Sequence, residues 1–241
     1  MELKPIRTDD RPVGGPVGYD GAYEVPDSAQ GQKVLRNTYL LLALTMVPTV
    51  IGAFVGMASA GIVYAYPIIS SLAMLAAVIG LQVGIIANRN SGIGIALLLL
   101  MTGVLGWWLG PMLNYALALS NGMQLVGYAA VGTGVIFFAM GAVATTVKRD
   151  FSFLGKFLFV GMWAILIAMV ANMFLQIPAL ALTISSLVIV VFSLFLLHDL
   201  SRIVTGGETN YVIATTGVYM SLFNIFANLL HLLMALTGEK D

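Results

Sequence analysis

Long apolar segments separated by short polar breaks fill this chain from residue 37 to residue 238. A helix that crosses the hydrocarbon core of a bilayer needs about 20 predominantly apolar residues. Seven segments of that kind stand between the charges and the turn-forming residues. We therefore expect an all-α polytopic membrane protein with seven transmembrane helices, near Thr38–Met57, Tyr64–Ala87, Ile93–Leu109, Leu125–Val147, Phe157–Leu175, Ala179–Leu197 and Tyr211–Leu236.

The breaks between the segments contain glycine, proline and asparagine, which favour turns. Gly110-Pro111 predicts the end of the third helix, and Gly206-Gly207 predicts the end of the sixth. The first break, near Ala58–Val63, is only weakly marked, so its boundary is the least defined.

Composition excludes an ordinary soluble domain. The chain has 241 residues, of which 59% are hydrophobic and 9% charged, and its mean hydropathy is +0.97. Soluble domains carry about 25% charged residues. The net charge is zero and no basic stripe is present, so nucleic acid is not an expected partner. The absence of cysteine excludes disulfides, thiol catalysis and cysteine-based metal sites.

Residues 1–36 differ from the rest, because they hold five basic and six acidic residues. Their glycine- and proline-rich stretches cannot build a core, so we expect a flexible cytosolic tail before a transmembrane domain of residues 37–238. No apolar run precedes Val34, which predicts that the first span itself directs insertion. The tail is either a simple leader or a handle for a cytosolic partner, with Tyr19 and Tyr23 as its large side chains.

Polar residues inside apolar spans are the strongest pointers to function. In the last span, Gly217, Ser221, Asn224, Asn228 and His231 follow spacings of four, three, four and three, so they share one helix face. Lipid would not solvate such a face, and we expect it to look into the bundle. Hydrogen bonds between helices are one role for it, and ion handling is the other.

Further polar candidates lie near the ends of the predicted spans. Asp199 is expected one to two turns inside the cytoplasmic end of the sixth helix, with Arg202 as its nearest partner. Glu208 complements the dipole of the last helix, and Thr209 or Asn210 caps that helix.

Two other patterns predict contacts between helices. Asn172 and Gln176, four residues apart, are placed to link the fifth helix to a neighbour. Three glycine pairs with GxxxG spacing predict close helix packing: Gly52/Gly56, Gly80/Gly84 and Gly106/Gly110.

Signatures of enzymes are missing from the sequence. No HExxH, GxSxG or Walker loop occurs. Ser221 and His231 are ten residues apart, about 15 Å along one helix, so they cannot form a catalytic dyad. We expect no catalytic residue, no cofactor and no metal site, and we interpret the chain as a non-enzyme.

Several motifs resemble the Bax inhibitor family of seven-helix membrane proteins. They are residues 34–39 (VLRNTY), 110–114 (GPMLN), 151–155 (FSFLG), 169–180 (MVANMFLQIPAL) and 206–226 (GGETNYVIATTGVYMSLFNIF). The resemblance covers roughly residues 33–236 and implies a bundle with the last helix at its centre. Within the family, the sequence most resembles the bacterial branch typified by the modulator of FtsH protease. That branch implies an inner-membrane protein that binds an FtsH-type protease and restrains its degradation of membrane proteins, with the HflK/HflC complex as a further candidate partner.

The same family resemblance implies a second activity, a pH-sensitive calcium leak. Its gate resembles two aspartates that share a proton, one ending the sixth helix and one in the seventh. Asp199 matches the first position, but Ser221 stands at the second and cannot ionise. This departure favours protease modulation by binding, with the calcium leak as the alternative and a passive scaffold as a third possibility.

The distribution of lysine and arginine predicts the topology. Ten of the eleven basic residues precede the first span or fall in the loops after the second, fourth and sixth spans. The positive-inside rule makes that side cytoplasmic, so the C-terminus is expected in the periplasm. A reporter enzyme that works only in the periplasm should be active when fused after Asp241. A fluorophore that matures only in the cytosol should be bright when fused before Met1. A dark N-terminal fusion, or an inactive C-terminal one, would refute this topology.

Overall fold

The computed structural model describes residues 28–147, 151 and 153–238, and this part of the chain is entirely helical apart from turns. Its helices are α1 (Ser28–Ala58), α2 (Ala60–Ala65), α3 (Pro67–Ala87), α4 (Gly92–Leu117), α5 (Gly122–Val147), α6 (Phe153–Leu175), α7 (Pro178–Val204) and α8 (Tyr211–Thr237). All except α2 are long and apolar enough to cross a membrane, so seven spans are present, as predicted.

Several helix boundaries differ from those predicted. Helix α1 begins at Ser28, so residues 28–36 are helical and do not belong to a flexible tail; the remainder of that predicted tail, residues 1–27, lies outside the described residues. The predicted end at Gly110-Pro111 is wrong, because α4 continues to Leu117 with Pro111 buried inside it. Membrane helices tolerate proline where neighbouring helices satisfy the freed backbone groups. In addition, the Tyr64 hydroxyl of α2 donates a hydrogen bond to the carbonyl oxygen of Pro111 at 2.8 Å, which joins α2 to α4.

The weakly marked first break contains the short helix α2, and Pro67 then occupies the first turn of α3. Proline is favoured there, because the first N–H groups of a helix have no partner within it. Helix α7 continues past the apolar span to Val204 and ends before Gly206-Gly207, as predicted, so Asp199 lies inside the helix.

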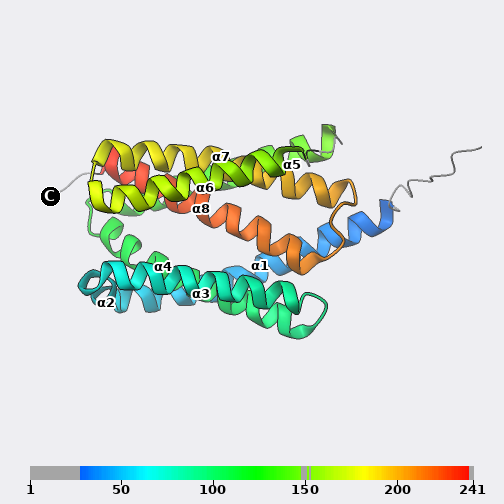
Figure 1. The fold of residues 1–241 in the computed structure, drawn as a ribbon, viewed down its shortest axis with the longest axis horizontal. Helices are drawn as coiled ribbons and strands as arrows, with labels where there is room; N and C mark the ends of the chain where they lie inside the picture. Colours follow the sequence, from blue (N-terminus) through cyan, green and yellow to red (C-terminus); the bar gives the residue numbers. More distant parts are fainter. Residues whose placement is uncertain (1–27, 148–150, 152, 239–241) are drawn as a thin grey trace, which may run out of the picture.

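The helices form two layers with α8 between them (Figure 1). Helices α1 to α4 make one layer, and α5, α6 and α7 make the other. Helix α8 packs against α1, α3, α4, α5 and α7. No residue of α8 before Ala235 is exposed, although α8 is the least apolar of the seven spans. The prediction that the last helix is central is therefore confirmed.

Helices α1 and α4 make the most extensive helix contact in the described structure, and glycines create it. A Cβ atom added at Gly52 would overlap the backbone of Gly103, and one added at Gly106 would overlap the backbone of Thr49. Gly56 and Gly110 face each other in the same way. Two of the three predicted GxxxG pairs therefore meet each other, as expected for close packing. The third pair does not do so, because Gly80 faces open space and Gly84 meets only the side chain of Leu97.

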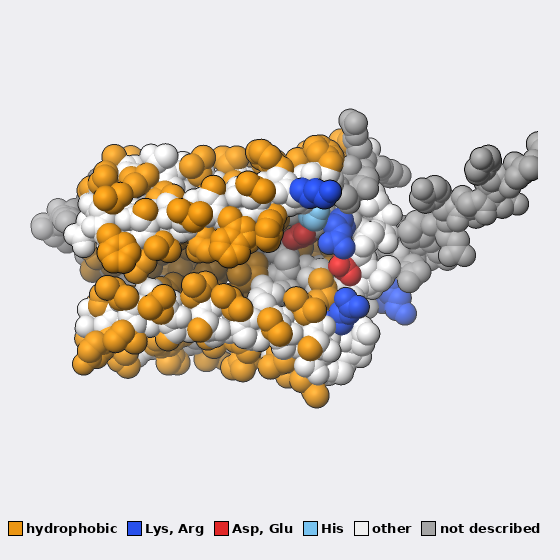
Figure 2. Space-filling view, in the orientation of Figure 1, with side chains coloured by type: hydrophobic (Ala, Val, Ile, Leu, Met, Phe, Trp, Pro, Cys, Tyr) orange, Lys and Arg blue, Asp and Glu red, His pale blue; other side chains and the backbone are white. Residues whose placement is uncertain are grey.

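The outer surface of the bundle is apolar along most of its length (Figure 2). Phe54, Phe138 and Phe174 are among many large apolar side chains that are more than half exposed, as lipid-facing residues are. Basic side chains gather at one end of the molecule, which we call the basic end. It contains the start of α1, the α3–α4 turn, the start of α6 and the α7–α8 turn, with Lys33, Arg36, Arg89, Lys156 and Arg202.

Replacement of Gly106 by alanine should destabilise the fold, because the added methyl group forces α1 away from α4. Overpacking of this kind costs about 1–3 kcal/mol. Gly80→Ala is the matched control, since its methyl group would meet no atom within 4 Å. Thermal unfolding in detergent should show a lower melting temperature for Gly106→Ala and no loss for Gly80→Ala. Equal melting temperatures for the two variants would contradict the role assigned to this contact.

Candidate functional site

A cavity of about 330 Å³ opens near the basic end, between α3, α6, α7 and α8. Its polar lining comes from Gln82, Asp199, Arg202, Glu208, Thr216 and Ser221. The rest of its wall is mainly apolar and includes Ile86, Met162, Phe192, Phe195 and Met220. Three of the residues singled out from the sequence near the α7–α8 turn therefore share one cavity with Ser221 of the polar face on α8.

Asp199 does not form the predicted ion pair with Arg202. Its Oδ1 atom lies 3.2 Å from Nδ1 of His198, which is its neighbour in sequence. A Cβ atom built on Gly217 of α8 would stand only 2.5 Å from the Oδ2 atom of Asp199, which is too close for a side chain there. The missing side chain at Gly217 thus allows the carboxylate to lie against α8. This contact explains why glycine occupies one position of the polar face.

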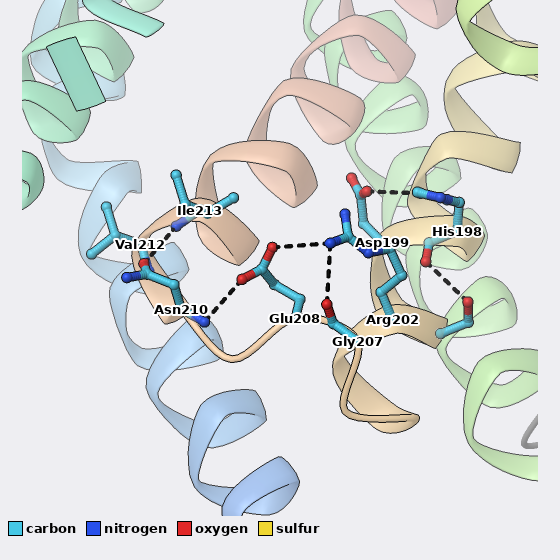
Figure 3. A network of polar contacts seen from close by, with 9 residues as sticks. His198, Asp199, Arg202, Gly207, Glu208, Asn210, Val212 and Ile213 are labelled. Atoms are coloured by element: carbon cyan, nitrogen blue, oxygen red, sulfur yellow. Dashed lines mark hydrogen bonds and ion pairs between the residues drawn. The ribbon is translucent and has the colours of Figure 1, made fainter. Parts of the chain in front are cut away.

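Arg202 instead binds the turn that follows its own helix (Figure 3). Its Nη2 atom donates to the carbonyl oxygen of Gly207 at 3.1 Å and to Oε2 of Glu208 at 3.4 Å. Gly206 has a φ of 79°, a left-handed conformation that ends the helix. The reversal brings the N–H of Glu208 to the carbonyl oxygen of Arg202, at 3.0 Å. The turn therefore draws Arg202 toward Glu208, which is why the i,i+3 spacing gave the wrong partner.

Of the two capping residues that the sequence offers, Thr209 and Asn210, it is Asn210 that caps α8. Its Oδ1 atom accepts the N–H groups of Val212 and Ile213, at 3.0 and 3.2 Å. Glu208 fixes this cap, because its Oε1 atom accepts the N–H of Asn210 at 2.9 Å. The Nδ2 atom of Asn210 donates to the carbonyl oxygen of Arg89 and to Oδ1 of Asn90, at 3.0 and 2.8 Å. Asn210 thus joins the α7–α8 turn to the α3–α4 turn.

The polar face of α8 points inward, but its members differ in their partners. Ser221 is buried and lines the cavity. Asn224 and Asn228 donate to carbonyl oxygens of their own helix, those of Met220 and Asn224, at 2.8 and 2.9 Å. The hydrogen bonds between helices expected for these two asparagines are therefore not made. Both side chains are half-buried, and each amide donates a hydrogen bond to the backbone of its own helix.

His231 makes the one hydrogen bond of this face that joins two helices. Its Nδ1 atom lies 2.8 Å from Oγ of Ser185 on α7. The sequence did not indicate Ser185 as the partner of His231, because the register of α7 against α8 is not encoded within either helix. No carboxylate among the described residues contacts the His231 ring, as a Ser–His–Asp triad would require. We interpret this pair as a structural link.

Asn172 does not link helices either. Its Oδ1 atom accepts the N–H of Ile177 at 3.0 Å, beyond the end of α6. Gln176 takes a positive φ of 53° in the same turn. Asn172 therefore shapes the α6–α7 connection and does not line the cavity. Within the described ranges, no group of three or more His, Asp or Glu residues is placed to hold a metal ion.

The fold and the site together define a class. Seven apolar helices, an apolar outer surface and polar groups held inside the bundle are the properties of a polytopic membrane protein. Residues 31–238 match the family described as "Inhibitor of apoptosis-promoting Bax1". The chain belongs to this Bax inhibitor family, as its motifs predicted.

Relatives in bacteria cover most of the chain. "Modulator of FtsH protease YccA" of Escherichia coli K12 is 42% identical over 201 residues, which are 83% of this chain and 89% of the relative. The "Inner membrane protein YccA" of E. coli O6:H1 matches with the same figures. An "Uncharacterized membrane protein" of Vibrio cholerae is 40% identical over 202 residues, 83% of this chain and 88% of the relative. With its seven spans, the chain is a multi-pass inner-membrane protein.

Loss of the Asn210 side chain should loosen the basic end. Asn210→Ala removes the cap and both contacts to the α3–α4 turn, and a lost cap alone costs about 1 kcal/mol. Asn210→Ser keeps a capping oxygen but is too short for the second set of contacts. Melting temperatures in detergent should fall from wild type to serine to alanine. Thr209→Ala, an exposed neighbour without a side-chain bond in the described structure, should match wild type. An unchanged melting temperature in Asn210→Ala would show that the cap and the contacts to the α3–α4 turn do not contribute to stability.

Proposed function

We propose that this protein modulates an FtsH-type membrane protease by binding to it and without chemistry of its own. The observation that carries the proposal is the similarity to the E. coli modulator of FtsH protease, at 42% identity over most of both chains. The Bax inhibitor family match over residues 31–238 supports it. The HflK/HflC complex remains a candidate partner on the family resemblance alone.

Two routes of action follow from the way the chain is built. The helical body can occupy the opening through which membrane substrates reach the protease. Alternatively, residues 1–27 can serve as the handle, and the domain behind them resists extraction. The packing of α1 supports the second route, because α1 comes directly after these residues and pulling it out would break the glycine-mediated contact with α4.

The calcium leak is the rival function, and one observation bears on it. Asp199 and Ser221 line the same cavity, as the resemblance to a gate of two aspartates implies. Ser221 cannot share a proton as a second carboxylate would. The other acidic residue of the cavity, Glu208, is already bound to Arg202 and to the N–H of Asn210. We therefore propose that calcium conduction, if measured, is weak.

Overproduction of the protein should lengthen the half-life of a membrane substrate of FtsH, measured by pulse-chase. Affinity purification from native membranes should recover protease subunits. Deletion of residues 1–27 leaves α1 intact and should shorten the substrate half-life again if the tail is the handle. A retained effect would assign the activity to the helical body. An unchanged half-life with wild type, and no recovered protease, would refute the proposal.

Calcium flux into proteoliposomes tests the rival. Wild type should conduct little and respond little to pH between about 6 and 8, because only one carboxylate of the implied gate is present. Ser221→Asp supplies the second carboxylate and should make any flux pH-dependent, with Ser221→Ala as the neutral control. Strong pH-gated flux in wild type that is lost in Asp199→Asn, with no change in substrate half-life, would favour the leak channel.

A further inference from the structure

The cavity at the basic end is reached from the side of the bundle. Its lining joins α3 of one layer to α6 and α7 of the other, with α8 at its floor. Helices α3 and α6 have no substantial contact with each other. Figure 2 shows a groove between the two layers, with acidic and basic side chains gathered at one end of it. In a membrane, the apolar length of this groove faces lipid.

The cavity contains a carboxylate, that of Asp199, and a guanidinium, that of Arg202. Both have hydrogen-bonding capacity that no described residue takes up. The Asp199 side chain is 22% exposed, and within the described ranges its carboxylate meets only the imidazole of His198. The Arg202 side chain is 37% exposed, and in the same ranges it donates only through Nη2. Among the described residues, the cavity therefore offers a carboxylate that is paired with no Lys or Arg and a guanidinium with N–H groups to spare, one turn apart on α7.

Asp199 lies near one end of its membrane-spanning helix, toward the edge of the hydrocarbon core. It lies five residues from the end of α7, about 8 Å along the helix. The headgroup and interfacial regions of a bilayer lie just outside a hydrocarbon core about 30 Å thick. A carboxylate without a cation is costly near that core, so a ligand that brings a cation is favoured there.

The remaining lining suits a hydrocarbon chain. Phe192 and Phe195 on α7 face the cavity together with Met162 of α6 and Ile86 of α3. A volume of about 330 Å³ is within the range of small-molecule sites, and it is large enough for a headgroup and the first part of an acyl chain. The site thus has a polar part with charges of both signs at one end and an apolar wall beside it.

We propose that this cavity binds a phospholipid that carries a primary ammonium beside its phosphate, phosphatidylethanolamine. The ammonium group binds Asp199, the phosphate binds Arg202, and an acyl chain lies against Phe192 and Phe195. A purely anionic lipid such as phosphatidylglycerol has no cation for Asp199. Phosphatidylcholine has a cation but no N–H to donate. The inference concerns lipid recognition and does not depend on the proposed protease partner.

Native mass spectrometry of the full chain, released from detergent with defined lipids of equal chain length, tests this site. Wild type should retain phosphatidylethanolamine in preference to phosphatidylglycerol and phosphatidylcholine. Asp199→Asn should reduce that preference about tenfold, because a hydrogen bond between two charged groups is lost. Gly217→Ala should reduce it as well, since the added Cβ displaces the carboxylate without removing its charge.

Ser193→Ala is the control on the same helix, because among the described residues Ser193 bonds only to Ile189 of α7 and does not line the cavity. It should retain the wild-type preference, and the melting temperature of each variant separates a lost site from a lost fold. Equal retention of the three lipids by wild type, or an unchanged preference in Asp199→Asn, would overturn the proposal. A photo-crosslinker at Met162 that captures a protein and no phospholipid would overturn it too, in favour of a basic protein segment.

Discussion

The absence of water in the bilayer core is the constraint on which this fold depends, because each buried polar group must find its partner inside the protein. Helix α8 is the least apolar of the seven spans, and it is enclosed by both layers of the bundle. Two solutions appear along it. Asn224 and Asn228 satisfy their donors on their own backbone. Tyr219 reaches across to α1 and α4, where its hydroxyl lies 2.8 Å from Oγ1 of Thr49 and 3.3 Å from the carbonyl oxygen of Thr102.

Within a bilayer, packing two helices together removes no apolar surface from water, so the hydrophobic effect does not hold the helices together. The contact between α1 and α4 shows what replaces it. Lipid is as apolar as leucine, so close packing of backbones supplies the attraction between helices. Gly52, Gly56, Gly106 and Gly110 permit that approach because none has a Cβ atom. The same contact anchors α1, the helix nearest the N-terminus. Extraction of α1 from the bundle would therefore have to break this glycine interface.

The basic end combines rigidity with an open cavity. Arg202, Glu208 and Asn210 tie the α7–α8 turn to the α3–α4 turn, which closes the bundle at that end. Asp199 stays outside this network and lies against Gly217 of α8. One acidic side chain thus stabilises a turn while the other remains available to a ligand. This division makes Asp199 the residue of the site whose replacement is most informative.

The number of membrane spans, their helical type and the inward face of α8 were determined by the sequence alone. Apolar segments of about 20 residues and the i,i+3/i,i+4 spacing of polar residues encode them locally. The cap by Asn210 was equally local, since it needs only the residues next to it. Motifs in residues 34–226 were also sufficient to indicate the family.

The tertiary structure alone decided how the helices meet. The continuation of α4 through Pro111 was not evident from the sequence, because a buried proline is tolerated in a membrane helix only where other helices pack around it. The partner of Arg202 was set by a left-handed turn at Gly206, and the partner of His231 by the register of α7 against α8. Only one glycine pair failed to pack as predicted, because nothing in its own spacing shows whether a neighbouring helix is present. Spacing along one helix specifies a face, whereas contacts between helices depend on distances that a single helix does not encode.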